Sequence, residues 1–204
     1  ACGVGVIAST EGKKSREIVE YGIEALKAVW HRGAVDADGK TGDGAGIHVE
    51  IPKDFFIEKI EVTGHDYDNS EICVGMIFLP RNDYASQESC KTIVESELTK
   101  NDFSIYGWRQ VPVNPKILGE KALQTMPEII QVLFKPNNQN LIGKNLERKI
   151  YETRKKIENK AFESSLNNFY ICSISSKSII YKGLYLAQAI SDFYLDLRDK
   201  RFIS

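Results

Sequence analysis

Residues 169–184 read FYICSISSKSIIYKGL, and this stretch decides the fold class. It contains two apolar runs, residues 169–174 and 178–184, with only a short interval between them. Runs of this length and composition predict two strands that follow one another without an intervening helix. Elsewhere in the chain, strand patterns alternate with helical patterns. Strands that occur in pairs as well as alternating with helices predict a layered α+β fold.

The rest of the chain supplies the other elements of this fold. Apolar residues that alternate with polar ones, or that form short continuous runs, predict strands at residues 2–8, 47–51, 72–79, 103–111 and 129–134. Apolar residues that recur every three or four positions predict helices over residues 15–33, 52–60, 90–98, 141–161 and 186–197. Ser15 is suited to cap the first of these helices, and Pro52 is acceptable in the first turn of the second.

Composition limits the classes of function. The chain has 204 residues, of which 42% are hydrophobic, enough for one domain with a substantial core and for two at most. Its 27 basic and 28 acidic residues give no positive surplus of the kind that binds nucleic acid or an anionic membrane. No apolar run is long enough to cross a bilayer, and no secretory signal is recognisable. We expect a cytoplasmic location, or a plastid one if a leader has been removed.

Three of the four cysteines have the features of core residues. Cys73 and Cys172 lie inside strand-like apolar runs, and Cys90 lies in a helical pattern. No cysteines form a CxxC pair, and the three histidines share no metal-ligand spacing. We therefore expect no disulfide bond and no metal site, and a reducing environment for the chain.

Cys2 stands apart because it lies almost at the amino terminus and leads directly into an apolar run. A thiol attacks only as the thiolate, so a catalytic cysteine needs a base or a cationic environment. An N-terminal cysteine carries its own base, because its α-amino group has a reference pKa of about 7.7 to 8.0. Ala1 precedes Cys2 here, so this chemistry requires that Ala1 be removed. The alternative is that Cys2 is a buried structural cysteine.

The segment Trp30-His31-Arg32-Gly33 closes the first predicted helix and allows two interpretations. Cations in the last turn suit the helix dipole and a glycine suits the residue after the helix end, which is a sufficient structural account. Alternatively, Arg32 lies near Cys2, where its charge favours the thiolate or binds an acidic group of a substrate.

The following segment, DADGKTGDGAG at residues 36–46, is rich in glycine and aspartate. Its spacing fits neither a calcium-binding loop nor the GxGxxG phosphate fingerprint, and it lies between a helix and a strand instead of between a strand and a helix. Its glycines allow sharp turns or a close approach of the backbone to another group. It is therefore either a surface turn or a loop packed beside the nucleophile.

Four stretches together carry a family resemblance. They are CGVGVIAS (2–9), ALKAVWHRGAVDADGKTGDGAGIHVEIP (25–52), IYGWRQVPVN (105–114) and FYICSISSKSIIYKG (169–183). The chain resembles the amino-terminal glutaminase domain of the glutamate synthase large chain, from Cys2 to its last residue. The wider relationship is to the class II glutamine amidotransferases, which are N-terminal nucleophile hydrolases. The resemblance implies a four-layer αββα sandwich, of which this chain would hold an incomplete, N-terminal part.

The resemblance also implies roles for individual residues. Cys2 corresponds to the N-terminal nucleophile, which attacks the side-chain amide of L-glutamine and forms a γ-glutamyl thioester. Arg32 corresponds to the arginine that supports the nucleophile region, and Gly3 is a weaker candidate for the same support. The strand around residues 44–47 is expected beside the nucleophile strand.

Relatives continue beyond the position of Ser204 into an RxSTNT-like segment and an Asn-Gly pair, which hold the substrate's α-carboxylate and form the oxyanion hole. We therefore expect that residues 1–204 are truncated on the C-terminal side, and that they have little or no activity alone.

The resemblance further implies a place in nitrogen assimilation. The released ammonia would aminate 2-oxoglutarate to L-glutamate in synthase domains of the same polypeptide. Those domains would hold FMN and an iron-sulfur cluster, whereas no cofactor is expected in this chain. Electrons would come from NADPH, NADH or ferredoxin, through a small electron-delivering subunit where the donor requires one. Two alternatives are an amidotransferase domain for another acceptor and a non-catalytic scaffold that only packs against a synthase partner.

Overall fold

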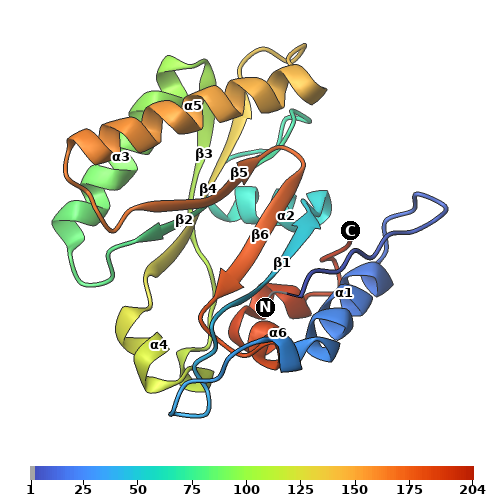
Figure 1. The fold of residues 1–204 in the computed structure, drawn as a ribbon. Coiled ribbons are helices and arrows are strands. Elements are labelled where there is room, and N and C mark those ends of the chain that lie inside the picture. Colours follow the sequence, from blue (N-terminus) through green and yellow to red (C-terminus); the bar gives the residue numbers. More distant parts are fainter. Residues whose placement is uncertain (1–2) are drawn as a thin grey trace. The chain divides into compact units, whose positions relative to one another are not determined.

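The computed structural model describes residues 3–204, apart from the side chain of Arg32, and confirms the predicted α+β class (Figure 1). The strands are β1 (Ala45–Glu50), β2 (Cys73–Leu79), β3 (Phe103–Gln110), β4 (Glu128–Pro136), β5 (Tyr170–Ser175) and β6 (Ser178–Gly183). The α-helices are α1 (Arg16–Ala28), α2 (Lys53–Val62), α3 (Tyr84–Lys100), α4 (Glu120–Thr125), α5 (Gly143–Glu163) and α6 (Ile190–Phe193). Short 3₁₀ helices are η1 (Trp30–Arg32), η2 (Pro115–Ile117), η3 (Ala187–Ala189) and η4 (Leu195–Arg198).

The chain forms two compact units. Among the described residues, the first contains residues 3–52, 111–126 and 180–204, and the second contains residues 53–110 and 127–179. All the strands predicted from residue 47 onward are present, β5 and β6 in particular, and their bounds agree with the sequence pattern within a few residues.

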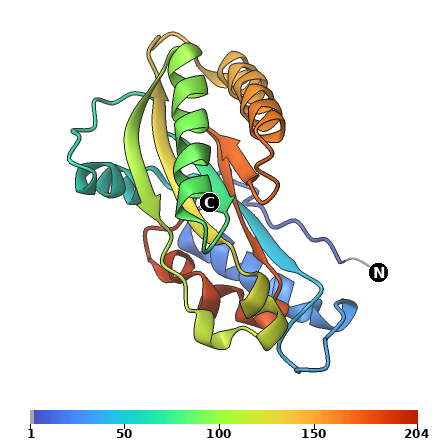
Figure 2. The same ribbon diagram turned by 90° about the vertical axis from the view of Figure 1, so that its left-hand side faces the viewer.

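A four-stranded antiparallel sheet forms the centre of the second unit, with the strand order β3-β4-β2-β5. β2 is buried along nearly its whole length, as its continuous apolar run predicts. α3 and α5 lie side by side on one face of this sheet (Figure 2). The core between the helices and the sheet contains Leu98 and Val94 from α3, Ile150 and Ile157 from α5, and Phe134 from β4. These helices form here because their apolar residues recur on one face.

The first unit contains the two-stranded sheet β1-β6, whose arrows point in opposite directions in Figure 1. α1 packs against β1 through its buried residues Val19 and Ile23. Ser15 caps α1 as predicted, because its hydroxyl accepts a hydrogen bond from the amide of Ile18 at 3.3 Å. In β1 the exposed side chain of His48 alternates with more buried neighbours, as the sequence predicts.

A cluster of aromatic side chains forms part of the core of the first unit. Its members are Tyr181, Tyr185, Phe193, Tyr194 and Phe202, whose rings meet mostly edge to face. The Tyr181 hydroxyl donates to the buried carboxylate of Asp196 at 3.0 Å, and the Tyr194 hydroxyl donates to the Lys182 carbonyl at 2.8 Å. The hydroxyls of Tyr181 and Tyr194 are therefore satisfied inside the unit.

Two sequence predictions are wrong. The described part of the opening strand, residues 3–8, forms no strand, because Val4 and Val6 leave 91% and 86% of their surface exposed and no side of the segment is buried. The predicted helix over residues 186–197 breaks into η3, α6 and η4. Its backbone is diverted to the segment before η2: the Phe193 carbonyl accepts from the amide of Asn114, and the amide of Leu195 donates to the Pro112 carbonyl.

Candidate functional site

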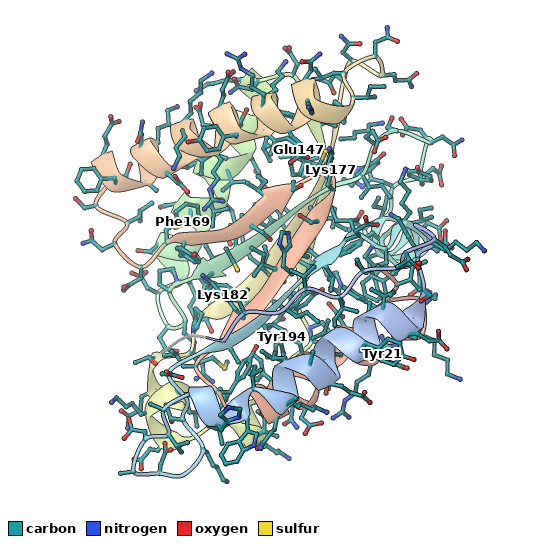
Figure 3. The ribbon with its side chains drawn as sticks, turned by 45° about the vertical axis from the view of Figure 1, so that its right-hand side comes forward. Tyr21, Glu147, Phe169, Lys177, Lys182 and Tyr194 are labelled. Atoms are coloured by element: carbon teal, nitrogen blue, oxygen red, sulfur yellow. The ribbon has the colours of Figure 1, made fainter. Side chains whose placement is uncertain are left out.

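Gly3 borders two cavities of the first unit. The smaller, of about 180 Å³, is lined by Gly3, the end of α1, the segment around η1, residues 42–45 and residues 185–187. The larger, of about 570 Å³, lies between residues 3–7, α1 and β1. Figure 3 shows the opening segment running alongside α1 and β1, while the labelled Tyr21 on α1 points away from it. The residue that follows Cys2 thus lies at the junction of both cavities.

The predicted site residues have different outcomes. Cys2 lies outside the described residues, so its role stays a prediction. Arg32 is described only by its backbone, which lies in η1. Its neighbours Trp30 and Gly33 line the smaller cavity together with Gly3. The structure therefore brings Gly3 and the turn that carries Arg32 to one cavity.

α1 ends at Ala28, and the turn around η1 is a single 3₁₀ turn that follows it. The amide of Gly33 donates to the Trp30 carbonyl at 3.1 Å and closes the turn. Gly33 itself has extended backbone angles, φ −91° and ψ 149°, and not the left-handed conformation common after helix ends. A Cβ on Gly33 would lie 3.1 Å from Asp43 Oδ1, so this turn lies close to the glycine-aspartate loop.

The glycine-aspartate loop has a defined structure. Val35 and Gly42 form an antiparallel bridge, and the amide of Asp36 donates to the Thr41 carbonyl at 2.9 Å. Gly39, with φ +69°, supplies the left-handed residue that the turn between them needs. Residues 42–45 then line the smaller cavity. Residues 37–40 are exposed, whereas Thr41 and Gly42 are buried and residues 42–45 border the cavity beside Gly3. Because Cys2 lies outside the described residues, a loop packed beside the nucleophile stays a prediction.

Two aspartates hold this loop by hydrogen bonds to charged oxygens. Asp38 accepts from the Thr41 hydroxyl at 2.6 Å and from the amides of Thr41 and Lys40 at 2.7 and 2.9 Å. The bond from the Thr41 hydroxyl, followed by those from the two amides, holds the pKa of Asp38 well below its ordinary value. Lys121 likewise lowers the pKa of Asp36, to which its ammonium donates at 2.7 Å. Both carboxylates are therefore ionised at neutral pH and fixed as structural acceptors.

Sequence reasoning missed residues 185–187, which form the opposite wall of the smaller cavity. They follow β6 directly, and the only signal in the sequence is their position just after the family-like stretch that ends at Gly183. Asp43 was also not singled out. It is the only charged side chain among the described residues that line this cavity.

The cysteines predicted to lie in the core do so. Cys73 and Cys90 are fully buried and Cys172 nearly so, and none of the three is in a disulfide bond. Within residues 3–204, no group of three or more His, Cys, Asp or Glu side chains is arranged to hold a metal ion. No helix in the described part of the chain has both the length and the apolar character needed to cross a membrane.

Known proteins match the chain along its whole length. A family model described as "Glutamine amidotransferases class-II" matches residues 2–204. The glutamate synthase (NADPH) large chain of Azospirillum brasilense is 53% identical over 204 residues, which is 100% of this chain and 13% of that protein. The ferredoxin-dependent glutamate synthase 1 of Arabidopsis thaliana is 40% identical, and the ferredoxin-dependent glutamate synthase 2 of Synechocystis is 36% identical, with the same coverage.

The chain therefore spans about an eighth of the length of these curated relatives. The family match begins at Cys2 and includes the turn and the loop that border Gly3. Because the model covers all but the first residue, the chain belongs to the class-II glutamine amidotransferases.

Proposed function

We propose that the chain hydrolyses the side-chain amide of L-glutamine with the thiol of Cys2, and that it delivers the ammonia to a glutamate synthase reaction. The observation that carries the proposal is the position of Gly3. The residue next to Cys2 borders a cavity whose walls include the turn around η1 and the glycine-aspartate loop, which both lie in the family-like stretch 25–52.

The proposed reaction begins with a free α-amine on Cys2, which accepts the thiol proton. The thiolate then attacks the amide carbon of glutamine, which forms a carbon–sulfur bond and a tetrahedral oxyanion. The carbon–nitrogen bond breaks, and the nitrogen leaves as ammonia with the proton returned by the α-ammonium group. Water attacks the resulting thioester and gives up a proton to the amine, and glutamate leaves as the thiol is restored. No electrons are exchanged in this half of the reaction.

The cavity lining offers a negative charge to the α-ammonium group of this substrate. Glutamine carries an α-ammonium group, and the carboxylate of Asp43 is the charged side chain of the described lining. We propose that Asp43 contributes to glutamine binding by its negative charge. Arg32, on the turn beside Trp30 and Gly33, is proposed to support the nucleophile, in line with the family resemblance.

The second half of the reaction is proposed for the longer protein. Ammonia, 2-oxoglutarate, two electrons and two protons would give L-glutamate and water in synthase domains of the same polypeptide. FMN and an iron-sulfur cluster would carry the electrons there, supplied by a nicotinamide cofactor through a smaller subunit or by ferredoxin. Relatives named for NADPH and for ferredoxin both match this chain in full. We propose a cytoplasmic or plastid location. The names of two Arabidopsis relatives contain the word "chloroplastic".

The test compares two nitrogen sources in the full-length protein. Cys2→Ala should abolish glutamine-dependent glutamate synthesis and leave ammonia-dependent synthesis unchanged. Cys90→Ala is the matched control, because Cys90 is buried in α3 of the second unit, and it should retain both activities. Mass spectrometry of the wild type should show Cys2 as the first residue.

Persistence of glutamine-dependent synthesis in Cys2→Ala would reject the proposed nucleophile. If the wild type uses ammonia but not glutamine, the scaffold alternative is correct. A separate assay of ammonia release from L-glutamine by residues 1–204 with a free Cys2 amine tests the expectation that they have little activity alone.

A further inference from the structure

The short helix α4 begins without a capping side chain of its own. Its N-cap residue is Gly119, so the first amides of the helix need acceptors from elsewhere. The hydroxyl of Thr41, in the glycine-aspartate loop, accepts from the amide of Ala122 at 3.3 Å. The same hydroxyl donates to Asp38 at 2.6 Å. The loop thus caps a helix that lies about 80 residues away in the sequence.

Gly119 allows this close contact. A Cβ on Gly119 would overlap the side chains of Asp38 and Thr41 and would lie 2.6 Å from the amide nitrogen of Thr41. The backbone angles of Gly119, φ −71° and ψ 163°, are open to any residue. Glycine is therefore required at this position by the close approach of the loop and not by its own conformation.

The contact is continuous with the cavity wall. Thr41 is 5% exposed, and its amide and carbonyl are both bonded within the loop, to Asp38 and Asp36. Gly42, the next residue, bridges to Val35 and begins the stretch 42–45 that lines the smaller cavity. A shift of Thr41 must therefore move the wall.

We propose that Asp38, Thr41 and Gly119 form a clasp that positions the 42–45 wall, and that this clasp sets the affinity for glutamine. The inference rests on the proposed function for the identity of the ligand. The three are positioning residues, since they act on the cavity through the backbone of residues 42–45. The clasp includes α4, a segment outside the four family-like stretches.

The test measures binding of L-glutamine by calorimetry to the full-length protein that carries Cys2→Ala, so that no turnover occurs. Adding Thr41→Val removes the hydroxyl at nearly constant volume and should weaken binding about tenfold, the loss of roughly one buried hydrogen bond. Adding Gly119→Ala should weaken it by a similar factor. Thr41→Ser keeps the hydroxyl and should bind as the parent does. Gln124→Ala, on the exposed side of α4, is the matched control and should also be unchanged.

Hydrogen exchange reports on the clasp independently of the ligand. The amides of Thr41 and Ala122 are bonded within it and should exchange faster in Thr41→Val, with Thr41→Ser restoring the protection. In the otherwise wild-type enzyme, the same variants should raise KM for glutamine, with kcat and ammonia-dependent synthesis changed less than about twofold.

The outcomes separate the two proposals. Unchanged glutamine binding in both Thr41→Val and Gly119→Ala would overturn the clasp, whatever the enzyme does with glutamine. Weakened binding in these variants, together with a wild type that does not hydrolyse glutamine, would keep the clasp and reject the proposed chemistry. If the Cys2→Ala protein binds no glutamine at all, both proposals fall.

Discussion

Gly42 lies directly against the backbone of Tyr185. A Cβ on Gly42 would lie 2.5 Å from the Tyr185 carbonyl oxygen and 2.7 Å from its carbonyl carbon. The glycine-aspartate loop and the segment after β6 therefore meet backbone to backbone, and both line the cavity that Gly3 borders. This contact closes one side of the proposed glutamine site.

Gly42→Ala should disturb both stability and activity. The added methyl group would meet backbone atoms, which cannot move aside by a change of rotamer, so one of the two segments must shift. We expect a loss of about 1 to 3 kcal/mol in the free energy of unfolding, as for other overpacked sites. We also expect a lower kcat/KM for glutamine with ammonia-dependent synthesis unchanged, measured in the full-length protein.

Gly22→Ala adds the same methyl group, but we expect it to leave the free energy of unfolding unchanged or to raise it. Gly22 lies inside α1, where alanine is preferred to glycine by about 1 kcal/mol. Its nearest neighbour would be the Cδ1 atom of Ile47 at 3.3 Å, the end of a flexible side chain. Denaturant unfolding should show equal or greater stability. A loss as large as that of Gly42→Ala would show that backbone contact is not what distinguishes the two glycines.

The fold was predictable wherever a local pattern decides the conformation. The continuous apolar run of β2 and the paired strands β5 and β6 were identified because burial imposes their composition. The break in the helix expected over residues 186–197 was not predictable, because this segment forms backbone hydrogen bonds with Pro112 and Asn114, which lie in a distant part of the sequence. The strand order β3-β4-β2-β5 is equally non-local.

The candidate site shows the same division. Gly3, the turn at Arg32 and residues 36–46 were found because the family resemblance marks contiguous stretches. Residues 185–187 and the helix α4 were missed, since their relevance comes from contacts with Gly42 and Thr41 across the first unit. A helix capped by a residue of another segment leaves no capping pattern in its own sequence.

Glu147 of α5 should stabilise the turn between β5 and β6. Its carboxylate accepts from the amide and hydroxyl of Ser176, both at 2.7 Å, and from the Ser175 hydroxyl at 2.9 Å. In Figure 3, Glu147 lies beside Lys177 at this turn. Glu147→Ala should lower the free energy of unfolding, measured with denaturant, by about 1 to 3 kcal/mol, because it leaves three donors without their acceptor.

Arg148→Ala is the neighbouring control for this prediction. The Arg148 side chain is 81% exposed and pairs with Glu152 along the helix, so the free energy of unfolding should fall by less than about 0.5 kcal/mol. Equal effects of the two alanine variants would mean that helix propensity, and not the turn, determines the cost.

Glu97 of α3 should make the free energy of unfolding depend on pH in the acidic range. Its side chain is only 6% exposed and pairs with Lys160 of α5 and with Lys100. The hydrogen bond from Lys160 is the main cause that lowers the pKa of Glu97 in the folded protein. A lowered folded pKa means that the stabilisation is complete above the unfolded value of about 4.3 and is lost as the pH falls through the folded value.

Glu97→Gln should therefore be less stable than the wild type at pH 7, by about 1 kcal/mol, and the difference should shrink below about pH 4. Denaturant unfolding at several pH values measures this. Glu88→Gln on the same helix is the control, because its side chain is 72% exposed and its loss should be small at every pH. A Glu97→Gln difference that does not vary with pH would exclude the ion pair as its source.

Alkylation should distinguish Cys2 from the other three thiols. Burial raises the pKa of Cys90 to about 11, which leaves on the order of one thiolate in 10⁴ at pH 7. Burial also raises the pKa of Cys73, with the charges of Glu147 and Glu71 adding to the effect. Cys172 is 5% exposed and is shielded from reagent by burial.

Iodoacetamide at neutral pH should therefore label Cys2 in the native protein and leave the three buried cysteines unmodified, as read by peptide mass spectrometry. L-Glutamine should slow the labelling of Cys2, whereas denaturant should expose all four thiols. If Cys90 is labelled in the native protein as fast as Cys2, burial does not protect Cys90. If glutamine leaves the labelling rate of Cys2 unchanged, Cys2 does not lie in the proposed substrate site.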